Sequence, residues 1–369
     1  MTGNIAKRPN GRWRARYRDG AGKEHARHFT TKKAAAHWLN EITAAMTTGA
    51  YVAPDAGKIT FKQYAEYWRT KQTHRPSTVE QVERHLRNHV YPSIGDRQLD
   101  TLRHTDMQAL AKTLDENLST NTASVIWRYV GTIFRAAVED KRIVDSPCRK
   151  VRGPKPKKTK VAVMLTEQVA ALREAVPDRY AALIVTAAGT GMRQGELFGL
   201  TIDRINFLRQ QITVDRQLIG LAGREPEFGP PKTEDSDRVI PLPAVVAQAL
   251  AVHLQKYATG PDGLVFTNTY GAPLRRSNFG ATWRRACRDA DVHGFTFHDL
   301  RHYYASLLIR HGESAETVRA MLGHKTAMET WKTYAHMWPD SDERTRAAVD
   351  SVLGASAVAD SVRTTPASM

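Results

Sequence analysis

Two motifs in the second half of the chain pair an arginine with a second polar side chain at helical spacing. Residues 189–197 read Gly-Thr-Gly-Met-Arg-Gln-Gly-Glu-Leu, in which glycines allow a turn and Arg193 lies three residues before Glu196. His298 and Arg301 are also three residues apart, in His-Asp-Leu-Arg-His. A planar guanidinium matches the oxygens of a phosphate. Phosphate chemistry competes here with two simpler interpretations, a surface ion pair and a solvated helix edge.

Three more side chains could take part in the same chemistry. Gly323 is expected to end a short helix, and His324 follows it in Met-Leu-Gly-His. Tyr334 comes ten residues later, in Thr-Tyr-Ala-His. Taken alone, such a histidine is more often a structural cap and such a tyrosine a core residue. Lys232, in Pro-Pro-Lys-Thr, precedes an expected strand that ends Arg-Val-Ile-Pro-Leu, and Lys256 is a more distant alternative to it.

The order and spacing of these motifs resemble those of the tyrosine recombinase family, the phage integrases in particular. That family is marked by an arginine in a Thr-Gly-x-Arg-x-x-Glu turn, a lysine on a β-hairpin, a His-x-x-Arg helix, a Leu-Gly-His turn and a nucleophilic tyrosine. The matching residues in this sequence are Arg193 with Glu196, Lys232, His298, Arg301, His324 and Tyr334. The resemblance is strong over residues 165–345 and extends to the segments before them.

The resemblance implies transesterification at a DNA phosphodiester. Tyr334 would attack phosphorus and form a 3′-phosphotyrosine with a free 5′-hydroxyl, which is covalent catalysis by a nucleophile that needs activation. Pentacoordinate phosphorus carries extra negative charge, which Arg193 and Arg301 would stabilise as a preorganised clamp. Lys232 would give a proton to the leaving 5′-oxygen.

The resemblance gives the remaining matched residues supporting roles. A tyrosine with an ordinary pKa near 10 needs help to lose its proton, and His298 would be the base. His324 would hydrogen-bond a non-bridging oxygen, and Glu196 would orient neighbouring groups. No cofactor or metal is expected, because the sequence has no Gly-x-x-x-x-Gly-Lys loop and no acidic cluster suited to two metals. Its two cysteines, Cys148 and Cys287, exclude a cysteine-based zinc site.

Several domains are needed to position these groups. We expect a small α+β domain of one sheet and one helix at residues 1–50, and an all-α core-binding domain at 58–148. A mostly α, mixed α/β catalytic domain is expected at 161–353. Residues 149–160 hold seven basic residues, two prolines and no acid, which is typical of an extended basic linker. Residues 354–369 are small and polar, and we expect a disordered tail.

The N-terminal segment has a strict alternation that predicts a strand. Residues 12–18 read Arg-Trp-Arg-Ala-Arg-Tyr-Arg, which places arginines on one face and uncharged residues on the other. The arginine face would consist of Arg12, Arg14, Arg16 and Arg18, and the other face of Trp13, Ala15 and Tyr17. A turn at 19–22, a return strand at 23–29 and a helix capped by Thr30 or Thr31 would complete the domain. A solvated strand face is the simpler interpretation, but contact with DNA is favoured.

The whole chain is basic. Its 369 residues carry 54 Lys and Arg against 38 Asp and Glu, a formal charge of +16, which favours nucleic acid as the partner. Besides the arginine face, the candidate DNA-binding residues are Arg84, Arg128, Lys155, Lys157 and Lys158. No apolar run reaches the roughly 18–20 residues of a membrane span, and the N-terminus lacks a signal-peptide core. A soluble cytoplasmic protein, associated with the bacterial nucleoid and without a membrane partner, is therefore expected.

The sequence favours a site-specific recombinase that integrates or excises a phage or mobile element. The expected partners are double-stranded DNA at crossover core sites and arm-type sites, a homotetramer on that DNA, and an accessory DNA-bending or directionality protein. Three other readings stay open: a DNA-binding regulator with an inactive catalytic-like domain, a relaxing type IB topoisomerase, and a chromosome-dimer-resolving recombinase. The complete set of matched residues argues against the first. Residues 1–50 argue against the other two.

Overall fold

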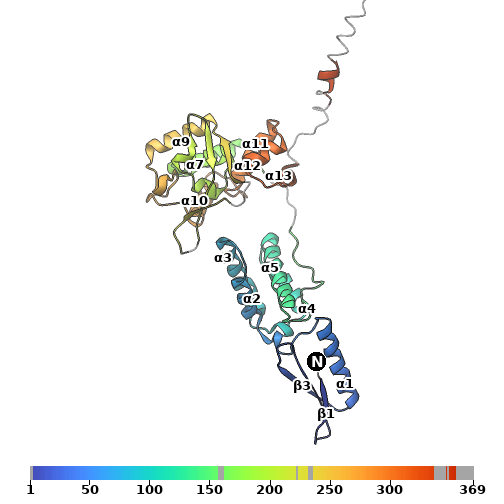
Figure 1. Cartoon of the computed structure of the whole chain (residues 1–369). Helices are drawn as coiled ribbons and strands as arrows, with labels where there is room; N and C mark the ends of the chain where they lie inside the picture. The colour runs from blue at the N-terminus through green and yellow to red at the C-terminus, as the bar shows by residue number, and fades with distance from the viewer. Residues whose placement is uncertain are drawn as a thin grey trace, which may run out of the picture. The chain divides into compact units, whose positions relative to one another are not determined.

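The computed structural model of the chain divides into two compact units, Met1–Lys158 and Thr159–Met369 (Figure 1). It describes residues 3–156, 162–221, 223–231, 236–335, 346 and 349–354. Three candidate residues, Lys157, Lys158 and Lys232, lie outside this description, as does all but the first residue of the expected tail. Within the described ranges, no helix is long and apolar enough to cross a membrane.

The N-terminal segment folds as an antiparallel sheet with one helix against it (Figure 1). The sheet has the order β1 (Asn4–Lys7), β2 (Trp13–Arg18), β3 (Glu24–Phe29), and helix α1 (Lys32–Thr47) follows. Ala15 and Tyr17 are buried while Arg16 and Arg18 are exposed, which confirms the predicted alternation. Thr31 caps α1 by accepting a hydrogen bond from the Ala34 amide. Arg12 precedes the strand.

The rest of the first unit is helical, as predicted. Its helices are α2 (Phe61–Thr70), α3 (Pro76–His85), a π-helical segment (Leu86–Gly95), α4 (His104–Asn117) and α5 (Thr120–Glu139), with 3-10 turns at Ala56–Lys58 and Leu99–Thr101. The α-helical winding of α3 ends at His85, but the chain does not leave the helix there. From Leu86 the backbone instead continues with wider π-helical winding through Pro92 and stops at Gly95.

The second unit surrounds two small sheets with helices. Its helices are α6 (Thr166–Ala175), α7 (Asp178–Thr190), α8 (Gln194–Phe198), α9 (Ala244–Lys256), α10 (Arg276–Asp289), α11 (Asp299–Arg310), α12 (Ala315–Leu322) and α13 (Ala327–Tyr334). Strands β4 (Ile205–Asn206), β5 (Gln211–Val214) and β8 (Arg238–Pro241) form one antiparallel sheet, and β6 (Gln217–Ile219) pairs with β7 (Glu227–Gly229). Short turns occur at Ile202–Arg204, Pro261–Gly263 and Asp350–Gly354. The predicted mixed, mostly α fold is confirmed.

Helix α7 supports much of this unit because it packs against α6, α9 and α11. It ends at Gly191, which has a left-handed backbone (φ 62°) that glycine adopts without strain. A Cβ built on Gly191 would lie 2.4 Å from the ring of Tyr304 on α11. Glycine at this position therefore permits both the sharp chain reversal and the close approach of α7 to α11.

Gly191→Ala should destabilise the protein. An L-residue in the left-handed region costs about 1–2 kcal/mol, and overpacking a filled core costs about 1–3 kcal/mol more. We expect the midpoint of thermal unfolding to fall by several degrees. Gly220→Ala is the matched control, because nothing lies within 4 Å of a Cβ there, and its midpoint should stay near that of the wild type. Equal midpoints for both variants would contradict the steric argument.

Candidate active site

The C-terminal end of helix α12 gathers three arginines. Arg238 donates through Nε to the Met321 carbonyl at 2.8 Å, Arg301 through Nη2 to Leu322, and Arg193 through Nη2 to Gly323 at 2.7 Å. The last carbonyls of a helix have no partner within it and form the negative end of its dipole, so cations are stabilised there. Gly323 has φ 63° and ends the helix as predicted. Three distant segments of the chain thereby meet at one helix end.

Arg301 is the most deeply placed of these arginines. Its side chain comes from the first turn of α11, only 3% of the residue is exposed, and its Nη1 donates to the Gly191 carbonyl at 2.7 Å. Burial, followed by the positive charge of Arg193, lowers the pKa of its guanidinium. Arg301 therefore does not lie at a solvated helix edge, since it is part of the interior and joins α7, α11 and α12.

Glu196 is the carboxylate that ion-pairs with this cluster. Arg193, which precedes α8, donates to it from the backbone N and from Nη1, both at 2.8 Å. Arg238 donates from the other side at 2.9 Å. Glu196 is almost fully buried, and burial opposes its ionisation, but the two arginines outweigh that effect and lower its pKa. The predicted three-residue pairing is confirmed, and Arg238 is a partner that the sequence did not reveal.

A loop residue completes the support of Arg193. Its Nη1 also donates to Ser236 Oγ at 2.9 Å, and Arg238 donates to the Ser236 carbonyl at the same distance. Both residues stand just before or within β8, in the stretch Ser-Asp-Arg-Val-Ile-Pro-Leu. The sequence offered one indication of this pair, namely that Arg238 begins the strand that follows Lys232. Alternation alone could not show that this arginine faces inward.

Tyr334 is the last residue of α13, and its side chain is buried with 1% exposed. Its hydroxyl lies 2.6 Å from Nδ1 of His302, which follows Arg301 on α11. Burial raises the pKa of Tyr334 to about 12, while the charge of Arg301 acts in the opposite direction. Sequence reasoning missed His302, although its position one helical turn after His298 was visible.

His298 and His324 lie on either side of this pair. His298 directly precedes α11, and its ring meets that of His302 edge-on, with the ring centroids 5.1 Å apart. His298 is exposed, yet the protein around it, and then the charges of His302 and Arg301, lower its pKa. His324 stacks parallel to Tyr334 at 6.5 Å and hydrogen-bonds Thr330 through Nδ1 at 2.8 Å. Burial and the nearby arginines lower the pKa of His324 to about 3, so both imidazoles are neutral at pH 7.

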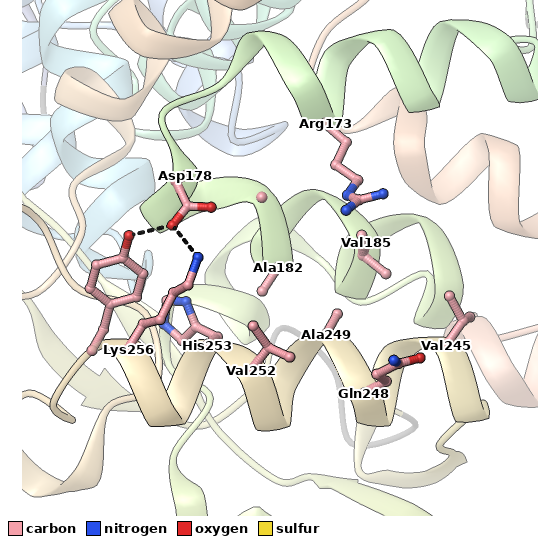
Figure 2. A pocket seen from close by; sticks show the side chains of 12 residues that line it. Arg173, Asp178, Ala182, Val185, Val245, Gln248, Ala249, Val252, His253 and Lys256 are labelled. Atoms are coloured by element: carbon pink, nitrogen blue, oxygen red, sulfur yellow. Dashed lines mark hydrogen bonds and ion pairs between the residues drawn. The ribbon is translucent and has the colours of Figure 1, made fainter.

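Lys256, the alternative to Lys232, is held elsewhere. A pocket of about 360 Å³ lies between α7 and α9, and Lys256 Nζ at its edge is 3.2 Å from Asp178 Oδ2. Figure 2 shows Lys256 beside Asp178. Asp178 starts α7, whereas Gly191 follows its other end, about 20 Å away at 1.5 Å per residue. Lys256 is therefore remote from Arg193 and Arg301, and Lys232 stays the predicted general acid.

The predicted DNA-binding residues belong to the first unit. Arg84 on α3, Arg128 on α5, and Lys155 are exposed. Arg14, Arg16 and Arg18 extend from β2 around Glu24 on β3, with N–O distances of 3.1, 3.7 and 3.6 Å. Glu24 thus lies opposite Arg18, at one end of the arginine face, and pairs with all three of these arginines.

Comparison with known families matches three consecutive parts of the chain. Residues 162–340 match the phage integrase family, residues 61–154 the phage integrase central domain, and residues 1–48 the phage integrase N-terminal domain. Together these ranges cover most of the sequence. The chain belongs to the phage integrase family of tyrosine recombinases.

Individual relatives agree with this membership. A "Tyrosine recombinase XerC-like" protein of Caldanaerobacter subterraneus subsp. tengcongensis is 26% identical over 87% of this chain and 90% of its own length. An integrase of Streptomyces ambofaciens is 28% identical over 82% of each chain. The fold resembles that of the Tn1549 transposon integrase in complex with transposon right end DNA, with TM-score 0.65, 22% identity, and coverage of 80% of this chain and 100% of that one.

A second structural likeness spans more of the chain. The lambda integrase dimer bound to a COC′ core site has a TM-score of 0.60 at 17% identity, and the match covers 92% of this chain and 95% of that one. At this level of identity the likeness concerns the fold, and the predicted fold class agrees with it.

Glu196→Gln should show how much the buried carboxylate supports the site. Its native pKa is lowered, so the ionised form adds stability above an ordinary glutamate pKa of about 4.3, and this stability is lost as pH falls through the native pKa. We expect a loss of about 3–5 kcal/mol in the free energy of unfolding at pH 7, since two buried arginines lose their counter-charge. The loss should shrink toward pH 3.

The matched control is Glu174→Gln, which removes an exposed ion pair with Arg173. It should cost at most about 1 kcal/mol. Denaturant unfolding of both variants and the wild type across this pH range measures the difference. A Glu196→Gln protein as stable as the wild type at pH 7 would contradict the role of the carboxylate.

Proposed function

We propose that this protein is a site-specific DNA recombinase that integrates or excises a phage or mobile element through a 3′-phosphotyrosine intermediate. The observation that carries the proposal is the position of the Tyr334 hydroxyl, which hydrogen-bonds His302 and lies in the field of Arg301. A nucleophilic hydroxyl beside preorganised cations is what phosphoryl transfer requires. The family of the chain and the DNA complexes of its structural neighbours support the same conclusion.

Arg193 and Arg301 are the proposed clamp for the reacting phosphate. A guanidinium has five N–H donors, and the bonds of Arg301 to Gly191 and Leu322 engage two of them. Arg193 is fixed in the same way by its bond to the Gly323 carbonyl. The remaining N–H donors of both arginines could therefore donate to non-bridging oxygens. His298 and His324 would add contacts to the phosphate, and Lys232 would protonate the leaving 5′-oxygen. The phosphotyrosine bond conserves the energy of the phosphodiester, so the proposed type IB reaction needs neither metal nor ATP.

The proposed domain roles follow the predicted boundaries. Residues 1–50 would bind arm-type DNA, residues 58–148 the crossover core site together with the catalytic domain at 161–353, and residues 149–160 would link them. Active assemblies would be homotetramers on DNA, acting in the bacterial cytoplasm with an accessory bending or directionality protein. A lambda integrase tetramer bound to a Holliday junction is among the structural neighbours and supports this assembly.

Tyr334→Phe should abolish the covalent protein–DNA adduct and leave binding to the core site nearly unchanged. The substitution removes the nucleophilic oxygen and its hydrogen bond to His302. Trapping on a nicked suicide substrate in excess EDTA, read on a denaturing gel, measures the adduct. An adduct with the variant would overturn the assignment of Tyr334. Loss of the wild-type adduct in EDTA would overturn metal independence.

Replacing Arg14, Arg16 and Arg18 together by Gln should abolish binding to a second, arm-type DNA sequence while core-site cleavage continues. These three side chains share one strand face. Phosphate contacts give a log–log salt slope of about −0.9 for each phosphate neutralised, so the slope for the full chain should also become shallower. Lys112→Gln, on the exposed surface of α4, is the control. Full recombination by the triple variant on an arm-containing substrate would contradict this role.

A further inference from the structure

His302 is the side chain in direct contact with the proposed nucleophile. The 2.6 Å separation between His302 Nδ1 and Tyr334 Oη is within hydrogen-bond reach of a general base. The contact joins α11 to α13, and the tyrosine is buried around it. The resemblance to the family predicts His298 as the proton acceptor, yet His298 meets His302 rather than being bonded to the hydroxyl among the described residues.

Other neighbouring groups are oriented for different contacts. His324 lies nearly parallel to the tyrosine ring, with an interplanar angle of 9°, and its Nδ1 bonds Thr330. Asp299 uses Oδ2 to accept hydrogen bonds from the backbone and hydroxyl of Thr296, each at 2.6 Å. Arg301 carries donors only. In the described part of the site, His302 is thus the group that presents a possible lone pair to Tyr334.

Burial, more than the charges around it, lowers the pKa of His302 and favours its neutral imidazole. Burial lowers its pKa, the charge of Arg301 lowers it further, and Asp299 opposes both. Among the described residues, the other titratable groups that face it are His298, directly before its own helix, and Tyr334 and His324 from the elements packed against it. A neutral imidazole with its hydrogen on Nε2 has the Nδ1 lone pair free. The tyrosine, whose burial disfavours the phenolate, needs such an acceptor.

We propose that His302 is a further catalytic residue, whose Nδ1 takes the proton of Tyr334 as the phenolic oxygen attacks phosphorus. This inference rests on the proposed role of Tyr334 as the nucleophile. The O–H bond of Tyr334 breaks and its proton moves to His302, which becomes an imidazolium. The new bond joins the phenolic oxygen to phosphorus, the bond from phosphorus to the 5′-oxygen breaks, and a separate acid protonates that oxygen. In rejoining, the 5′-hydroxyl returns its proton to the conjugate base of that acid as it attacks phosphorus, and the phosphotyrosine bond breaks while His302 returns its proton to Tyr334.

A substrate with a 5′-bridging sulfur isolates this step, because a thiolate leaves without a proton donor. On it, the full-length His302→Asn variant should form the covalent adduct about 10²–10⁴-fold more slowly than the wild type, the usual contribution of a general base. Asparagine can still accept a hydrogen bond from Tyr334 but cannot take its proton. His311→Asn, exposed at the C-terminal end of the same helix, should react at the wild-type rate.

Two readouts separate proton transfer from simple positioning. Added imidazole should restore adduct formation by His302→Ala. The wild-type rate should fall on the acid side, below the ordinary histidine pKa of about 6.5, as His302 becomes protonated. This fall in rate at acid pH, the acid limb of the pH–rate profile, should vanish in His302→Asn and persist in His298→Asn. Circular dichroism and core-site binding verify that each variant is folded.

The possible failures are distinct. A wild-type rate for His302→Asn, with Tyr334→Phe inert, would overturn the role of His302 and leave the proposed function intact. A slow variant without imidazole rescue and with an unchanged acid limb would reduce His302 to a positioning residue, which also overturns the proposal. An adduct formed by Tyr334→Phe would instead reject the nucleophile and the proposed function with it.

Discussion

The geometry of the candidate site depends on backbone carbonyls at the C-terminal end of one short helix, where they have no partner within the helix. Met321, Leu322 and Gly323 each accept from a different arginine. The three arginines come from β8, α11 and the turn before α8, so a helix end converts separate segments into one rigid constellation. The left-handed Gly323 then reverses the chain and brings His324 and α13 back over the same point. The arginines of the candidate site are thereby positioned by hydrogen bonds to backbone carbonyls.

Local signals were sufficient for much of this site. Helical spacing predicted the pairing of Arg193 with Glu196, and glycine chemistry predicted the end of α12. Contacts between distant segments were not predictable in this way. Arg238 and Ser236 became visible as partners of Glu196 and Arg193 only when β8 was placed against α12. His302 was overlooked for the same reason, since its partner is 32 residues away.

The fold was predicted best where a pattern was long and periodic. Alternation over residues 12–18 gave the faces of β2 correctly, and Thr31 caps α1 as expected. The segment around Pro92 shows where such patterns are less informative. A proline lacks an N–H, which normally ends α-helical winding, but the segment from Leu86 to Gly95 is already π-helical and continues through it. The two faces of a strand follow from the alternation of its side chains, whereas a change from α-helical to π-helical winding depends on tertiary packing.

The buried charge cluster ties the stability of the second unit to its ligand. Among the described residues, Arg193, Arg238 and Arg301 carry three positive charges, and one carboxylate, that of Glu196, ion-pairs with two of them. Repulsion among the arginines is therefore only partly neutralised in the free protein. A phosphate bound at this point supplies the missing counter-charge and stabilises the native state by mass action. Under the proposed function, DNA would therefore also act as a folding ligand for this unit, and a polyanion in purification buffers would have the same stabilising effect.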